Sequence, residues 1–300
     1  MSGSLRNENM SYWALVTVKN GERTMGRSLD SLLCQSVQPS LVCIVDDGST
    51  DSTPQILARY QALYPEIRVI TLPDKGYDSR RIVHNWNAAC DYVKSSGRHY
   101  DFHLISSDDI VFPEDYVSRL VREMELDQRL VVVSGNRSIA QSDYMSLPEG
   151  AGRLIRASFF SDIGCRHPPY YGYEPWLLYK AMQAGLRVKK LPDLTYEHER
   201  TFGLGHKFVE YGPAMRCLGY HPLFVLARVA RNFATGKAGI SKKASIKMLL
   251  DYLFEGRWKG DPYYRYFEPE IRAYVRGMQK KRLFSRLAIW PASPVGDLWQ

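Results

Sequence analysis

Two short acidic segments each follow directly after an apolar run. The first, VDDGSTDST at 45–53, follows LVCI, and the second, SSDD at 106–109, follows FHLI. Adjacent carboxylates repel one another, so a chain often keeps them where a divalent cation can bind both them and phosphate oxygens. The same letters also suit a tight turn and a helix entrance, because Asp-Gly turns readily and Ser or Thr caps helices. Taken singly, each segment leaves both interpretations open.

The spacing of apolar residues predicts the elements that would position these segments. The expected strands cover 13–19, 41–45, 68–72, 102–106 and 130–134, and the expected helices cover 28–35, 53–64, 82–94 and 113–124. Such alternation predicts an α/β fold with a mostly parallel sheet flanked by helices. In these sheets ligands bind beyond the carboxyl ends of the strands, which is where both acidic segments fall.

Composition limits the class of protein. The chain has 300 residues, of which 45% are hydrophobic, so it can bury a substantial core and is not a disordered chain. Its five cysteines are widely spaced and odd in number, which indicates free thiols in a reducing compartment rather than a disulfide framework. No signal peptide is recognisable, and no apolar run approaches the roughly 18 residues of a membrane span. We therefore expect a cytoplasmic protein.

The positive charge is concentrated in the last third of the chain. Residues 201–300 contain 17 Lys and Arg and 7 Asp and Glu, a net charge of +10, whereas the first 200 residues carry a net charge of −2. This shift predicts two domains, 1–200 and 201–300, the second mainly helical because its basic and aromatic residues recur at roughly helical spacing. Two interpretations are open: helices that meet an anionic membrane surface, or helices packed on the first domain with solvated basic residues.

The acidic segments and their surroundings resemble the family 2 glycosyltransferases over about the first 200 residues. The resemblance depends on LDSLLCQSVQPSLVCIVDDGSTDST, HLISSDDI and YYGYEPWLLYKAMQAGLRVKKLPD. It implies a Rossmann-like domain of GT-A fold that binds a nucleotide-sugar donor. It assigns Asp47 to the base edge and Asp46 to support of the loop, and a carboxylate can accept the hydrogen bonds that a base imide donates. Lys19 stands where many relatives carry an aromatic residue that stacks on the base.

The second acidic segment resembles the DXD motif of that family, with Ser106 in place of the first aspartate. In this alignment Asp108 and Asp109 are the metal-side carboxylates, and Ser106 can still hydrogen-bond a ribose. His198 stands where these enzymes present a histidine to the metal or diphosphate, although an isolated histidine is commonly structural. The implied cofactor is a divalent cation, manganese or magnesium, which neutralises the departing diphosphate. A nitrogen ligand would favour manganese.

Glu174 falls where the family carries the second acid of its ED motif, which implies a general base for the acceptor hydroxyl. The alternative is an acid that stabilises the start of a helix, expected at 176–184, through the helix dipole. Arg81 closes the basic loop PDKGYDSRR, and we expect this residue of the loop to meet a donor phosphate. The other interpretation is a solvated side chain.

The resemblance therefore implies an inverting glycosyltransferase that moves a sugar from a nucleoside diphosphate to a hydroxyl acceptor, in polysaccharide, glycolipid or lipid-linked glycan synthesis. Many relatives use lipid-linked acceptors, so we expect a cytoplasmic protein that lies peripherally at the inner face of the cell membrane. A non-catalytic nucleotide-sugar-binding or regulatory protein of the same fold is the alternative; Ser106 favours it, whereas Glu174 and His198 argue against it. No RNA- or DNA-binding module is recognisable, so nucleic acid is not expected as a partner.

Overall fold

The computed structural model describes residues 10–76, 78–138, 147–199, 210–235 and 241–287. The chain forms two compact units that are interleaved in sequence. The first comprises Met1–Ser138, Glu149–Arg166 and Leu191–Glu199, and the second comprises Ile139–Pro148, His167–Lys190 and Arg200–Gln300. The second unit thus includes a segment of the predicted first domain together with the C-terminal third, and the division at residue 200 stays a prediction.

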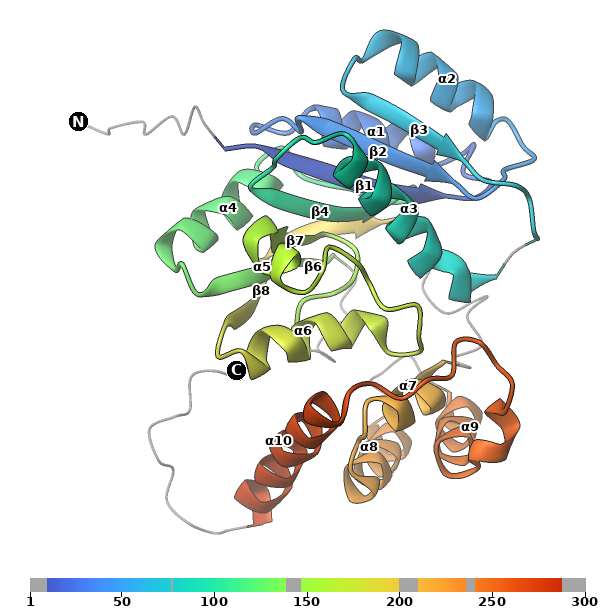
Figure 1. Cartoon of the computed structure of the whole chain (residues 1–300), viewed down its shortest axis with the longest axis vertical. Coiled ribbons are helices and arrows are strands. Elements are labelled where there is room, and N and C mark those ends of the chain that lie inside the picture. Colours follow the sequence, from blue (N-terminus) through green and yellow to red (C-terminus); the bar gives the residue numbers. More distant parts are fainter. Residues whose placement is uncertain (1–9, 77, 139–146, 200–209, 236–240, 288–300) are drawn as a thin grey trace. The chain divides into compact units, whose positions relative to one another are not determined.

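The first unit is built on an eight-stranded sheet with the order β3-β2-β1-β4-β7-β6-β8-β5 (Figure 1). Its strands are β1 (Tyr12–Val18), β2 (Leu41–Asp46), β3 (Ile67–Thr71), β4 (Phe102–Ser107), β5 (Ile110–Val111), β6 (Leu130–Arg137), β7 (Arg153–Arg156) and β8 (Arg187–His198). Strands β3, β2, β1 and β4 pair in parallel. The acidic segments follow β2 and β4, the two neighbours of β1.

Helices cover both faces of the parallel strands. They are α1 (Met25–Leu33), α2 (Thr53–Leu63), α3 (Ile82–Ser95), α4 (Tyr116–Leu126) and α5 (Ala157–Asp162), with a 3-10 turn η1 at Ser79–Arg81. All of β1 is buried, and its alternate residues Ala14 and Val16 pack in one core cluster with α1 and α4. Helix α1 contributes Leu29 and Leu32 from a single helical stripe. Helix α3 contacts β1 and β2 from the other face (Figure 1).

The remaining part of the sheet is antiparallel. Strand β7 pairs antiparallel with both β4 and β6, and β5 pairs antiparallel with β8. Each of the five predicted strands and four predicted helices corresponds to an observed one, but β5, β7, β8 and α5 were not predicted. β5, β7 and α5 are two to six residues long, too short to show a periodic apolar pattern. β8 is twelve residues long, but most of its residues are polar and it has no continuous apolar run.

The second unit is mainly helical in its described residues, and the C-terminal part of the chain is helical as predicted. It contains α6 (Tyr173–Gln183), α7 (Tyr211–Cys217), α8 (Pro222–Thr235), α9 (Lys242–Leu253), the 3-10 turn η2 (Glu255–Trp258) and α10 (Pro269–Leu287). Helix α9 contacts α7 and α8, and α10 contacts α6 and α8. The predicted helix at 176–184 is α6, which begins three residues earlier.

Two sequence-based expectations concern cysteines and membrane spans. All five cysteines are free thiols, as predicted: Cys34, Cys43, Cys90, Cys165 and Cys217. Within the described part of the chain, no helix combines the length and the apolar character needed to cross a membrane.

Candidate active site

The register of the central strands brings the two acidic segments to one edge of the sheet. Val18 lies opposite Asp46 on β2, and Thr17 lies opposite Ser107 on β4. Because these strands are parallel, their carboxyl ends coincide, and the segments that follow them lie on either side of the end of β1. The placement expected from the alternation of strands and helices is therefore observed.

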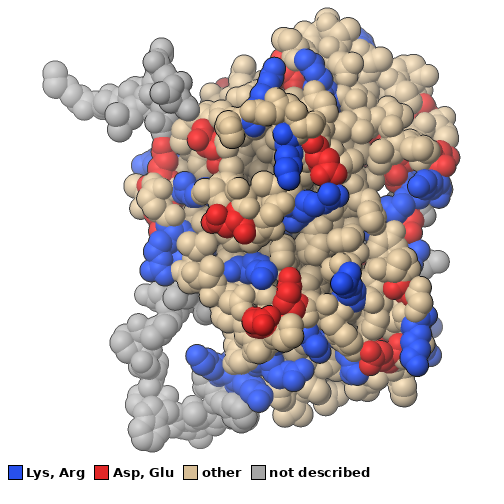
Figure 2. Space-filling view, viewed as in Figure 1, with Lys and Arg blue, Asp and Glu red and all other residues tan. Residues whose placement is uncertain are grey.

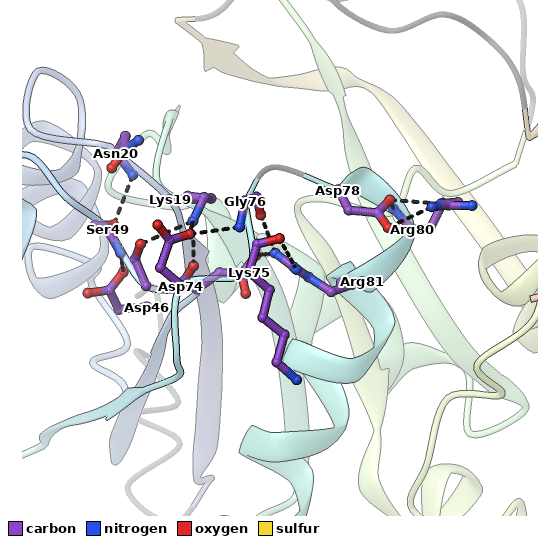
Figure 3. Close-up of polar contacts among 12 residues, drawn as sticks. Lys19, Asn20, Asp46, Ser49, Asp74, Lys75, Gly76, Asp78, Arg80 and Arg81 are labelled. Carbon is purple, nitrogen blue, oxygen red and sulfur yellow. Dashed lines mark hydrogen bonds and ion pairs between the residues drawn. The ribbon is translucent and has the colours of Figure 1, made fainter. Parts of the chain in front are cut away.

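Asp46 holds the turn that follows β2. Its side chain is 1% exposed, and its Oδ1 accepts a hydrogen bond from the backbone N–H of Ser49 at 2.9 Å (Figure 3). Such a bond from an aspartate to a backbone group further along the chain stabilises a turn. This contact agrees with the expected role of Asp46 in supporting the loop, while its part in donor binding stays a prediction.

Asp47 is fixed from two directions. Its backbone N–H donates to Val18 O at 2.9 Å, and its carboxylate Oδ2 accepts from Arg81 Nη2 at 2.9 Å. Both side chains are largely buried, with 11% of Asp47 and 15% of Arg81 exposed. Its Oδ1 accepts no hydrogen bond from a described residue. The arrangement therefore presents one clamped and one available carboxylate oxygen at the end of β2.

Arg81 reaches this position from the start of α3. Its guanidinium also donates to the carbonyl oxygens of Lys75 and Gly76, so it joins the loop after β3 to the loop after β2 (Figure 3). The nearby Arg80 pairs instead with Asp78 at 2.8 Å. The sequence singled out Arg81 for a donor phosphate, and the structure shows its guanidinium bound to Asp47. Contact with a phosphate stays a prediction.

Lys19 has a role that the sequence did not indicate. Its Nζ donates to Asp47 O at 2.8 Å, to Gly48 O at 3.0 Å and to Asp74 Oδ1 at 2.8 Å (Figure 3). The hydrogen bond from Lys19, followed by that from the Gly76 N–H, holds the pKa of the Asp74 carboxyl below its usual value. Asp74 therefore stays ionised at neutral pH. Lys19 therefore joins the loop after β2 to the loop after β3.

Gly48 is required by the close approach of these loops, and this gives a first testable prediction. Gly48 and Gly76 have φ of +72° and +73°, so alanine costs about 1–2 kcal/mol at either position. A Cβ on Gly48 would also lie 2.5 Å from the Asp74 backbone, whereas one on Gly76 would meet nothing within 4 Å. We expect Gly48→Ala to lower the free energy of unfolding, measured with urea, clearly more than Gly76→Ala. Equal losses would contradict the tight contact.

Asp108 is the buried acid after β4. Its side chain is 5% exposed, its backbone N–H donates to Thr17 O at 3.2 Å, and its Oδ2 accepts from Thr24 Oγ1 at 3.1 Å. Ser106, the residue in place of the first motif aspartate, is 2% exposed, and its hydroxyl lies 3.4 Å from Ser107 O. The contact of Ser106 with a ribose stays a prediction.

Asp109 and His198 are brought together by the short pairing of β5 with β8. Ile110 lies opposite His198, and the Glu199 N–H donates to Asp109 O at 2.8 Å. His198 Nε2 lies 3.7 Å from Asp109 Oδ2, while Oδ1 of the same carboxylate accepts from Ser107 Oγ at 2.6 Å. Two of the three predicted metal ligands are thus neighbours, although 89 positions separate them along the chain.

Glu174 belongs to the second unit, where it lies in the first turn of α6 and is partly exposed. Gly172 occupies the N-cap with φ +94°, and a Cβ there would lie 2.8 Å from Leu218. Glycine therefore permits the sharp entry that places Glu174 at the helix start. An acid in the first turn of a helix can act as a general base, and it can also stabilise the helix through the dipole. The position of Glu174 is compatible with both roles.

The sequence matches the family model described as "Glycosyl transferase family 2" over residues 13–173, more than half of the chain. The chain belongs to this family.

Curated relatives match over a shorter stretch. The chondroitin synthase of Pasteurella multocida (strain Pm70) is 32% identical over 114 residues, which cover 38% of this chain and 11% of that protein. The chondroitin synthase of Escherichia coli is 32% identical over 121 residues, which cover 40% of this chain and 16% of that protein. The match therefore spans less than a fifth of either relative.

Solved glycosyltransferase structures share the fold. Staphylococcus aureus TarS 1-349 in complex with UDP-GlcNAc has a TM-score of 0.53 at 17% identity, covering 81% of this chain and 72% of that chain. The mannosyltransferase PcManGT from Pyrobaculum calidifontis, in complex with GDP-Man and Mn2+, has a TM-score of 0.55 at 16% identity, covering 93% and 81%. The predicted α/β fold of GT-A type is confirmed.

The family implies a divalent cation. The side chains that follow β4 offer few ligand atoms for such a cation. Asp108 offers a buried carboxylate, a hard oxygen donor of the kind that Mg2+ and Mn2+ take. Both carboxylate oxygens of Asp109 already face protein groups, Ser107 and His198. In the described ranges, no three His, Cys, Asp or Glu side chains gather as a metal-ligating group. Asp108 thus has the chemistry of a cation ligand, and its role as one stays a prediction.

Sequence reasoning missed two polar residues of this candidate site, and it named a third without its contacts. They are Thr24, which contacts Asp108, Lys19, which ties the loops, and Asp74, which receives Lys19. Only Lys19 could have been recognised from the sequence. A lysine at the end of a buried strand commonly pairs with an acidic or carbonyl group nearby. Thr24 and Asp74 lie in ordinary loop sequence that offers no such signal.

Proposed function

We propose that the protein is an inverting glycosyltransferase that moves a sugar from a nucleoside diphosphate donor to a hydroxyl acceptor. The main support for this proposal is the arrangement of Asp47 in a chain of family 2. Arg81 binds the Oδ2 atom of Asp47, and the Oδ1 atom can accept a hydrogen bond from an N–H group of the base. Asp46 and Lys19 hold the surrounding loops. The Oδ1 atom of Asp47 is therefore in position before the nucleotide sugar binds.

In this proposal the reacting groups have separate roles. The acceptor hydroxyl oxygen attacks the anomeric carbon as the bond from that carbon to the diphosphate breaks, and Glu174 takes the hydroxyl proton. Asp108 would hold the divalent cation, which supplies neutralisation of the charge that develops on the leaving diphosphate. A single displacement of this kind inverts the anomeric centre.

The donor and product class rest on the comparisons. The matched relatives are named as synthases of chondroitin and hyaluronan, which are polysaccharides. The structural neighbours were crystallised with UDP-GlcNAc or GDP-Man, and one of them also with Mn2+. These names support a nucleotide-sugar donor, a divalent cation and a role in polysaccharide or other cell-envelope glycan synthesis.

The alternative is a nucleotide-sugar-binding protein without turnover, which the serine at position 106 favours. A panel of UDP- and GDP-sugars, tested with Mn2+ for thermal stabilisation and for hydrolysis, separates the two functions. A ligand that binds the native state raises the unfolding temperature by mass action. Stabilisation together with hydrolysis supports the transferase, whereas stabilisation without hydrolysis or transfer supports the binding protein.

Peripheral attachment to a membrane is a further part of the proposal. The second unit carries exposed apolar side chains on α8, including Leu223 at 58% and Leu226 at 46% exposure. Figure 2 shows Lys and Arg side chains over the visible face of the molecule, with acidic ones among them. Apolar side chains beside basic ones suit a surface that meets anionic headgroups.

We expect the full chain to sediment with vesicles that contain phosphatidylglycerol, and less so at 0.5 M than at 0.05 M salt, because salt screens surface charges. Leu223→Ser combined with Leu226→Ser should weaken the association at least tenfold, since full burial of one leucine is worth about 1.5–3 kcal/mol and tenfold corresponds to about 1.4 kcal/mol. Leu126→Ser, at a position that is 76% exposed in the first unit, is the matched control. Failure to sediment at low salt would remove membrane attachment from the proposal.

A further inference from the structure

A polar pocket lies within the second unit, formed by α7, α9, α10 and the segments beside them. Its volume is about 230 Å3. The side chains that matter for its chemistry are three arginines and three tyrosines, namely Arg216, Arg272, Arg276, Tyr220, Tyr252 and Tyr266. None of the residues that line it is acidic. The pocket shares no residue with the site at the ends of β2 and β4.

The positive charge of this pocket is only partly balanced. Arg216 Nη2 lies 3.1 Å from Glu255 Oε2. Neither Arg272 nor Arg276 forms an ion pair with a carboxylate of the described residues. These two lie four positions apart on α10, where like charges are neighbours and repel one another. An anion between the guanidinium groups would relieve this repulsion.

Arg272 also has an unused donor. Its Nε is buried and has no hydrogen-bond partner among the described residues. Leaving a buried donor of a charged group without a partner is costly, so such donors commonly face a ligand or an ordered water. Arg276 Nε, by comparison, donates to Gly219 O at 3.3 Å.

The tyrosines hold the arginines in place. The Arg272 guanidinium lies 4.3 Å from the ring centre of Tyr266, and that of Arg216 lies 5.6 Å from the ring centre of Tyr252. Tyr252 in turn donates its hydroxyl to Tyr220 O at 2.7 Å. A ligand that enters finds side chains already ordered, which lowers the entropy cost of binding.

Gly219 lets α10 approach the end of α7. Its φ is +73°, and a Cβ there would lie 2.7 Å from Arg272 Cβ. A side chain at this position would push Arg272 away from Arg216. The convergence of the arginines therefore depends on a backbone conformation that favours glycine.

We propose that this pocket binds the phosphate group of a phosphate ester. Its volume is below the roughly 300–1,000 Å3 of sites that take whole small molecules, so it suits a single charged group. One carboxylate satisfies one arginine fork, whereas a phosphate offers three or more oxygens in different directions and pairs with several guanidinium groups. The site is separate from donor binding and requires neither metal nor turnover.

Titration calorimetry with inorganic phosphate and with glycerol 1-phosphate tests this site in the full-length protein. We expect Arg272→Gln and Arg276→Gln each to weaken binding about tenfold, the loss typical of one charge-assisted hydrogen-bonded pair. Arg276 is exposed, so its variant leaves the packing intact. Lys281→Gln removes one positive charge from the face of α10 opposite Arg272, since nine residues at 3.6 per turn bring the side chain to the other side of the helix. This variant should bind phosphate as the wild type does.

Vesicles that contain phosphatidic acid distinguish a lipid phosphate from a soluble one. Loss of both vesicle binding and glycerol 1-phosphate binding in Arg272→Gln would indicate a lipid headgroup, and loss of glycerol 1-phosphate binding alone would indicate a soluble ester. The proposal is overturned if the wild-type protein binds neither phosphate probe, if both arginine variants bind as the wild type does, or if Lys281→Gln weakens binding equally.

Discussion

Replacing Asp108 by alanine is expected to lower turnover on the order of 1,000-fold and to remove Mn2+-dependent donor binding. The carboxylate would bridge the protein to the cation, and cation stabilisation of a leaving group is worth several kcal/mol, at about 1.4 kcal/mol per tenfold in rate. Donor hydrolysis and donor calorimetry, each with Mn2+ and with EDTA, measure the two effects. Wild-type activity that is unchanged in EDTA would contradict the role of Asp108.

Two companion variants separate the charge of Asp108 from its structural contact. Asp108→Asn keeps an oxygen that can accept from Thr24 Oγ1 but loses the charge, so it should fold normally and still lose cation-dependent binding. Thr24→Val removes the hydrogen bond while leaving the carboxylate. If Thr24→Val costs as much activity as Asp108→Asn, Asp108 acts by supporting the loop rather than by holding a cation.

Replacing Glu174 by glutamine is expected to lower turnover about 100-fold or more with donor affinity nearly unchanged. Glutamine keeps the size of the side chain but cannot take the proton of the acceptor hydroxyl, and general base catalysis typically contributes about 10²–10⁴-fold. Steady-state kinetics give the turnover, and calorimetry with the donor gives the affinity.

The matched control for this prediction is Glu270→Gln. Glu270 also lies in the first turn of a helix, α10, and the substitution removes the same dipole interaction far along the chain from the family motif. If both variants lose a few tenths of a kcal/mol of stability and neither loses turnover, Glu174 is a first-turn acid only. A Glu174→Gln variant that loses donor affinity and keeps turnover would make Glu174 a binding residue.

The parallel strands and the place of the acidic segments were predictable because they depend on local sequence. Each of β1, β2 and β4 is a run of apolar residues bounded by polar turns, and such a run predicts a buried strand whatever its neighbours are. Once three strands alternate with helices, right-handed crossovers bring their carboxyl ends to one edge. The positions of Asp47 and Asp108 follow from that rule without any knowledge of side-chain contacts.

The antiparallel half of the sheet was not predictable in the same way. Strand β7 has four residues and β5 has two, so neither carries enough sequence for a period. Their direction is set by pairing with β4, β6 and β8, which is tertiary information. The proximity of His198 to Asp109 depends on this pairing, and family resemblance alone suggested it.

By itself the sequence determined the α/β class, the family, the helical C-terminal region and the strand ends at which the acidic side chains lie. Only the tertiary structure decided which partners those side chains have: Arg81 on Asp47, Thr24 on Asp108, and the ordered arginines of the pocket formed by α7, α9 and α10. The physical reason is the separation along the chain of the residues that interact. Apolar periodicity is written into neighbouring residues, whereas a hydrogen bond between side chains 34 or 84 positions apart depends on where the packed core places two loops.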